Sequence, residues 1–178
     1  DEGPICIALE RAALRLHISD PPELRLTEET SSPFLVGTFR PVIVIPRSLA
    51  EQARPDELET ILLHELIHFK HRDTWIGWGQ AIVQSLMWFH PLVWIANAFV
   101  NHEREIVCDE AVLQYGRVTA AEYGETILRV LSLARGRSMV TGGLVGVFER
   151  GDRIQNRLES IMQFETNRKR SRLTHRMI

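Results

Sequence analysis

The spacing of apolar residues changes along the chain, from a helix to short strands and then to long helices. Residues 5–16 repeat apolar positions at helical spacing, which predicts an amphipathic helix within residues 1–17. Residues 23–46 carry short apolar stretches, which predict a strand region. Helical spacing then continues over residues 55–71, 73–89, 92–115, 120–134 and 151–164. The pattern therefore predicts an α+β fold, with a short N-terminal sheet and a mostly helical remainder.

The apolar run at residues 42–45 is a candidate surface for an extended peptide. Pro41 and Pro46 bracket this run, and proline at strand ends is typical of an edge strand. The outer backbone groups of an edge strand remain available to another extended chain. We therefore expect a substrate to pair with this strand by β-augmentation. The residues predicted to bind it are Val42, Ile43 and Val44.

The helix predicted over residues 55–71 carries the candidate chemistry. It contains His64-Glu65-Leu66-Ile67-His68. In a helix, histidines at this spacing lie about 40° apart and about 6 Å along the axis, so both imidazoles can reach one zinc ion. Glu65 lies about 100° around from His64, beside the metal, where it can act as general base toward an attacking water. The neighbouring residues are apolar, and inward polar side chains there are costly without a partner such as a metal.

A catalytic zinc also needs a third protein donor and an open position. The best source is Glu103-Arg104-Glu105-Ile106-Val107-Cys108-Asp109-Glu110. Glu105 and Asp109 share one helix face, so one carboxylate can bind zinc while the other accepts the free imidazole N–H of a ligand histidine. Glu103 and Glu110 are competing ligands. The expected cofactor is one zinc ion per chain.

The composition narrows the class of protein. The length of 178 residues fits a single domain. With 21 Lys+Arg against 23 Asp+Glu, the net charge of −2 gives no overall basic surface, so direct nucleic-acid binding is not expected. Two cysteines cannot form a disulfide framework.

The charges are nevertheless unevenly distributed. Residues 74–101 contain no Asp, Glu, Lys or Arg and hold all 4 tryptophans. Pro91 interrupts this run, so we expect a helical hairpin that either dips into a membrane interface or packs as internal core. The tail at residues 165–178 is strongly basic, which is typical of the cytoplasmic flank of a membrane helix. Together with a start at Asp1 rather than Met, this predicts a part of a longer membrane protein.

The ordered motifs resemble the BlaR/MecR-type membrane zinc metallopeptidases. The resemblance rests on His64-Glu65-Leu66-Ile67-His68 with Lys70-His71-Arg72-Asp73, on Trp88-Phe89-His90-Pro91-Leu92-Val93-Trp94, and on Glu105-Ile106-Val107-Cys108-Asp109-Glu110-Ala111-Val112-Leu113. It implies a gluzincin-like fold. Through the family pattern E-x-x-C-D it also makes Glu105 the third zinc ligand and gives Asp109 the role of supporting a ligand.

The resemblance further implies a zinc endopeptidase that faces the cytoplasm at a bacterial inner membrane. Its substrate would be a protein, either a transcriptional repressor or the protein itself, in signalling linked to antibiotic resistance. The domain would then span residues 1–178, with catalytic helices over 55–135, a loop over 136–146 and a basic juxtamembrane tail. One alternative is a house-keeping protease that processes membrane proteins. Another is a non-catalytic regulatory module in which Cys108 or Glu103 closes a structural zinc site.

The sequence leaves one catalytic role open. Peptide hydrolysis needs a donor aimed at the developing oxyanion. The candidates are Tyr115, Tyr123, His102, Arg153 and Arg157.

Overall fold

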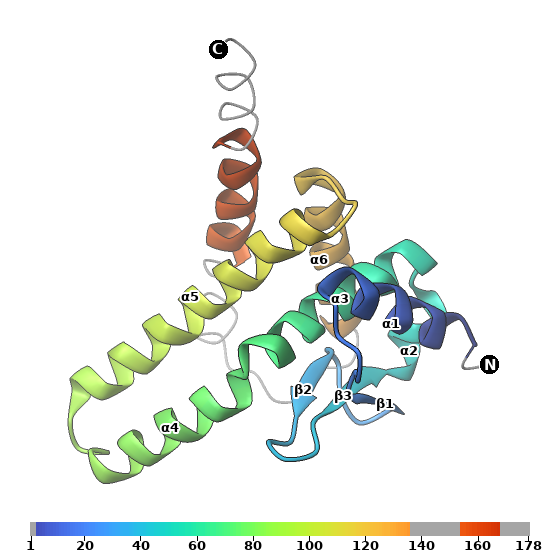
Figure 1. Ribbon diagram of the computed structural model, residues 1–178. Helices are drawn as coiled ribbons and strands as arrows, with labels where there is room; N and C mark the ends of the chain where they lie inside the picture. Colours follow the sequence, from blue (N-terminus) through green and yellow to red (C-terminus); the bar gives the residue numbers. More distant parts are fainter. Residues whose placement is uncertain (1–2, 136–153, 168–178) are drawn as a thin grey trace.

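The computed structural model describes residues 3–135 and 154–167. Its elements are α1 (Gly3–Leu16), β1 (Glu23–Thr27), β2 (Phe34–Val36), β3 (Val42–Pro46), α2 (Arg47–Gln52), α3 (Pro55–His71), α4 (Asp73–Leu86), α5 (Pro91–Tyr115) and α6 (Ala120–Arg135). A further helix covers residues 154–167. The described fold is therefore mostly helical with one small sheet, as the apolar pattern predicts (Figure 1). The predicted loop over 136–146, Arg153 and the tail from residue 168 onward lie outside the described residues.

The sheet has the strand order β1-β3-β2. β1 pairs parallel to β3, and β2 pairs antiparallel to its other side, so that Ile43 lies opposite both Leu24 and Leu35. The prediction that residues 42–45 form an edge strand is therefore wrong. Because both sides of β3 are already hydrogen-bonded to neighbours, Val42, Ile43 and Val44 have no open backbone edge for a substrate. β2 is the edge strand on that side of the sheet.

Helix α3 lies at the centre of the fold, in contact with α1, α4, α5, α6 and β2. Most of its apolar side chains are almost completely buried. They share one core with the apolar stripe of α1 and with Ile43 and Ile45 of β3. Burying each large aliphatic side chain contributes about 1.5–3 kcal/mol. Packing on several sides therefore fixes the helix that carries the two histidines.

The junction between α3 and α4 is a single residue, Arg72. Its φ of 58° and ψ of 39° lie in the left-handed region, and its backbone N–H donates to the carbonyls of His68 and Phe69. A left-handed residue is a common way to end a helix and redirect the chain. As a result, Asp73 begins α4 immediately beside the last turn of α3.

Helices α4 and α5 form the hairpin expected within residues 74–101 (Figure 1). They run side by side away from the rest of the molecule, and residues 87–90 connect them. The four tryptophans are between 49% and 69% exposed, so the interpretation of this run as internal core is wrong for this chain. None of the helices that the structure describes combines the length and hydrophobicity needed to cross a bilayer.

Candidate metal centre

Three potential metal ligands meet where α5 crosses α3. The Nε2 atoms of His64 and His68 are 3.1 Å apart. The carboxylate oxygens of Glu105 lie 3.7 Å from each of these nitrogens. Donor atoms around a tetrahedral zinc ion stand about 3.4 Å apart, given metal–ligand bonds of about 2.0–2.1 Å. The two imidazoles and the carboxylate therefore fit one zinc ion, and the competing acids Glu103 and Glu110 do not join this group.

The outer nitrogen of His68 is held by Asp73. Its Nδ1 atom donates to Asp73 Oδ2 over 2.6 Å, because a carboxylate can only accept. This bond leaves the Nε2 lone pair of His68 facing Glu105. Burial raises the pKa of Asp73, but its hydrogen bond with His68 and the charge of Arg104, 3.3 Å away, outweigh that effect and lower it. Helical spacing does not identify Asp73, because this residue lies beyond the end of α3.

The outer nitrogen of His64 is held by a chain of hydrogen bonds. His64 Nδ1 lies 2.9 Å from the hydroxyl of Tyr123, which in turn donates to Asp109 Oδ1 over 2.7 Å. Asp109 Oδ1 is also 3.4 Å from His64 Nδ1. Burial and the charge of Asp109 raise the pKa of Tyr123, which keeps the phenol protonated. Asp109 and Tyr123 thus both lie behind His64, on the side of its ring away from Glu105.

Arg157 connects the 154–167 helix to this network. Its Nε and Nη2 atoms donate to the two oxygens of Asp109 over 2.9 and 2.8 Å, and its Nη1 lies 3.1 Å from Glu105 Oε2. Burial raises the pKa of Glu105, but the hydrogen bond and charge of His64, together with Arg157, outweigh it and lower the pKa to about 2. Glu105 is therefore ionised at neutral pH, as a metal-binding carboxylate must be.

Replacing Arg157 with methionine is expected to destabilise the metal-free chain by about 3 kcal/mol, since Asp109 is almost fully buried and would lose its charge partner. Urea unfolding of the metal-free proteins measures the effect. Arg129→Met is the matched control. Its partner Glu57 keeps Arg54, and Arg129 is half-exposed, so the loss should stay below about 1 kcal/mol. Equal losses in the two variants would contradict the role given to Arg157.

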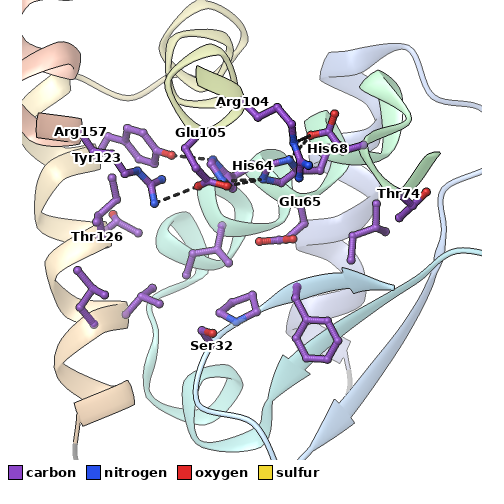
Figure 2. Close-up of a pocket in the computed structure, with 18 of the residues that line it drawn as sticks. Ser32, His64, Glu65, His68, Thr74, Arg104, Glu105, Tyr123, Thr126 and Arg157 are labelled. Carbon is purple, nitrogen blue, oxygen red and sulfur yellow. Dashed lines mark hydrogen bonds and ion pairs between the residues drawn. The ribbon is translucent and has the colours of Figure 1, made fainter. Parts of the chain in front are cut away.

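Glu65 lines a cavity of about 590 Å³ next to the three donors. Figure 2 shows its carboxylate pointing into the space between the histidines and Ser32. Burial raises the pKa of Glu65, and the neighbouring His64 and His68 partly offset this. Apolar side chains of α6 also line the cavity, namely Ile127, Val130 and Leu131.

Comparison with known proteins identifies the family. The family model described as BlaR1 peptidase M56 matches residues 1–161. The chain belongs to this family. This confirms the resemblance to BlaR/MecR-type proteins and supports a metallopeptidase-type function for the M56 domain.

Three named proteins are similar in sequence to this chain. The chain is 32% identical to the regulatory protein BlaR1 of Bacillus licheniformis over 139 residues, which are 76% of this chain and 22% of that protein. It is 32% identical to the methicillin resistance mecR1 protein of Staphylococcus aureus over 99 residues, 55% of this chain and 17% of that protein. A protease HtpX homolog of Methanocaldococcus jannaschii is 30% identical over 104 residues, 54% of this chain and 36% of that protein. The chain spans about a fifth of the length of the first two relatives.

Two of the five oxyanion candidates line the cavity of this M56 domain, Tyr123 and Arg157. The Tyr123 hydroxyl is already engaged with His64 and Asp109. Tyr115 lies elsewhere, with Lys70 Nζ 5.5 Å from its ring centroid. His102 is not among the residues that line the cavity, and Arg153 is outside the described part of the chain. Arg157 carries a positive charge, and its nitrogens are likewise engaged, with Asp109 and Glu105.

Cys108 lies on the opposite side of the His68 ring from His64 and Glu105. Its Sγ atom is 3.3 Å from His68 Nδ1, whereas Nε2 of the same ring faces Glu105. Burial raises the pKa of Cys108 well above its usual range, and the charge of Asp73 adds to this effect. Because the thiol faces Nδ1 and not the Nε2 atom that points to the donor group, this geometry does not favour Cys108 as a fourth ligand.

Replacing Asp73 with asparagine is expected to weaken zinc binding about 10- to 100-fold, because the carboxylate that orients His68 is lost. Competition titration against a chromophoric chelator measures the affinity. Asp56→Asn provides the control, since Asp56 is an exposed acid in the first turn of α3, the helix that carries His68. The role of Asp73 would be refuted by equal zinc affinities in both variants.

Proposed function

We propose that this M56 domain is a zinc-dependent endopeptidase with a gluzincin-like active site. The observation that carries the proposal is the convergence of His64, His68 and Glu105 beside Glu65 on one open cavity. Two histidines and a glutamate with a free fourth position form one of the established sets of ligands for a catalytic zinc. The tyrosine, aspartate and arginine behind them hold the ligands in place.

Zinc, when bound, supplies a Lewis acid that polarises the scissile carbonyl and acidifies water. Glu65 accepts a proton from the attacking water and returns it to the leaving amine. A raised pKa suits this task, because the carboxylate must both take up and release a proton near neutral pH. Arg157 lines the same cavity and brings positive charge to the side on which Glu105 lies.

The substrate backbone is proposed to pair with β2. This strand is at the edge of the sheet, and Ser32, Pro33, Phe34 and Leu35 line the cavity that contains Glu65. β-Augmentation on β2 replaces the predicted pairing with β3, whose two sides are occupied. The apolar wall formed by α6 then faces a side chain of the substrate.

The wider role is proposed from the family resemblance. The domain would act as the cytoplasmic effector of a membrane signalling protein, held to the inner membrane by flanking segments and by residues 74–101. Its protein substrate would be a transcriptional repressor or the protein itself. The matches to regulatory protein BlaR1 and to a methicillin resistance mecR1 protein support a link to antibiotic-resistance signalling.

Metal analysis combined with a peptide-cleavage screen tests the proposed activity. We expect one zinc ion per chain and cleavage of unfolded protein substrates by the zinc-loaded form. Cleavage should stop after chelation and return when zinc is restored. A zinc-loaded chain that cleaves no peptide in a broad library would contradict the proposal.

A further inference from the structure

Three amide side chains of the α4–α5 hairpin lie between its two helices. Asn97 of α5 donates from Nδ2 to Oε1 of Gln84 on α4 over 2.8 Å, and Gln80 Nε2 lies 3.4 Å from the Asn97 carbonyl. These three residues are half-buried between the helices. Helices that fold in water normally place such residues outward and bury their apolar side chains. The hairpin therefore has the opposite arrangement.

The outer surface of the hairpin is largely apolar. Large side chains of both helices and of the connecting turn are exposed, among them Ile82, Leu86, Trp88, Phe89, Leu92 and Ile95, with exposures between 56% and 73%. They are not confined to one stripe. A protein partner would cover one face of the hairpin, whereas exposure around the whole circumference fits a lipid environment, which contacts a projecting element on every side.

Two tryptophan N–H groups of the hairpin are also satisfied within the protein. The Trp94 indole donates to the Trp88 carbonyl over 2.9 Å, and the Trp78 indole donates to Thr38 Oγ1 over 2.8 Å. In hydrocarbon, a polar group without an internal partner costs several kcal/mol. Internal pairing of the amides and of these indoles lowers the cost of placing them in an apolar solvent, whereas the buried Nδ1 of His90 in the connecting turn has no partner among the described residues.

Charged residues flank the 74–101 segment of the hairpin, and none lies within it. Residues 74–101 contain no Asp, Glu, Lys or Arg. The exposed residues Lys70, His71 and Arg72 lie before this run, separated from it by the buried Asp73, and the exposed acid Glu103 lies after it. Phe39 packs on Trp75 with ring centroids 5.4 Å apart, which brings the exposed Arg40 to the same end. Basic residues at this position suit anionic lipid headgroups.

We propose that the α4–α5 hairpin inserts into one leaflet of a lipid bilayer, with the basic residues at its base on the headgroups. With 14 residues, α4 is about 21 Å long, which is shorter than the hydrocarbon core of about 30 Å. Insertion of the hairpin would hold the domain at the membrane, as proposed above, and does not require peptide hydrolysis. Because Thr74 and Gly77 at the base line the cavity, the cleft then opens beside the lipid surface.

Tryptophan fluorescence tests the insertion directly, since all 4 tryptophans lie in the hairpin. The chain is mixed with vesicles of equimolar phosphatidylcholine and phosphatidylglycerol. We expect a blue shift of the emission and quenching by lipids brominated on the acyl chains. The signal requires no substrate, so its failure would leave the peptidase proposal intact while overturning the insertion. A shift that depends on protein concentration without lipid would also overturn it, because that result indicates a second copy as the partner.

Two charge substitutions provide a matched pair. Leu86→Glu places a charge on the hairpin, and Leu14→Glu places one on α1; both leucines are 73% exposed, so neither change disturbs the core. We expect Leu86→Glu to lower the vesicle partition coefficient at least about tenfold. Leu14→Glu should bind vesicles like the unmodified chain. Equal binding by both variants would exclude the hairpin as the inserting element.

Discussion

Replacing Glu65 with alanine is expected to abolish hydrolysis while zinc stays bound. General acid–base catalysis contributes about 100- to 10,000-fold to a rate. Glu65 lines the cavity beside the three donors without belonging to them and, unlike the cavity-lining Asp73, is not hydrogen-bonded to a ligand histidine. The measurement is kcat for an unfolded protein substrate, together with the zinc content of the same preparation. Zinc content should match that of the unmodified chain, because Glu65 is not a ligand.

Glu65→Gln is the control for side-chain volume. Glutamine keeps the shape of the side chain but cannot accept the proton, so this variant should lose activity to a similar extent. Undiminished cleavage by either variant at full zinc content would refute the assignment of Glu65 as general base.

Replacing Glu105 with alanine should remove zinc and with it all activity. Glu105 supplies the only carboxylate in the described donor group with His64 and His68. Loss of a group that merely orients a ligand weakens metal affinity about 10- to 100-fold, so loss of a ligand should exceed 100-fold. Zinc competition titration measures the affinity.

Glu103→Ala is the matched control on the same helix. Glu103 is an exposed acid that competes with Glu105 as a ligand on sequence grounds alone. We expect the Glu103→Ala variant to bind zinc with unchanged affinity. If Glu103→Ala lost zinc and Glu105→Ala retained it, the third ligand would be Glu103 and the described arrangement of α5 would be incorrect.

The helix that carries the two histidines could be predicted from the sequence because its signals are local. Pro55 suits a first helical turn, acids follow it, and the apolar spacing continues to residue 71. The relation between His64, Glu65 and His68 follows from helical geometry alone. The structure accordingly has α3 over the predicted residues.

The strand order could not be predicted, because the decisive contacts join distant segments. The run Val42-Ile43-Val44-Ile45 is flanked by prolines, which favours an edge strand, yet an uninterrupted apolar run is also typical of a strand buried on both faces. Ile43 and Ile45 are completely buried. Here Pro41 and Pro46 mark the ends of the strand and remove no bond from its middle.

The residues that support the metal ligands were only partly predictable. Asp109 follows Glu105 at helical spacing, so its nearness to the site could be expected. Asp73 reaches His68 only because Arg72 turns the chain at the end of α3. Tyr123 and Arg157 come from later helices and reach the site through tertiary packing, so helical spacing could not distinguish them from the other polar candidates.

The central claim is that His64, His68 and Glu105 form a hydrolytic zinc site rather than a closed structural one. The zinc-edge X-ray absorption spectrum of the zinc-loaded chain tests it most directly. We predict a first shell of nitrogen and oxygen atoms only, at about 2.0–2.2 Å. A sulfur atom at about 2.3 Å would show that Cys108 binds the metal and would contradict the claim.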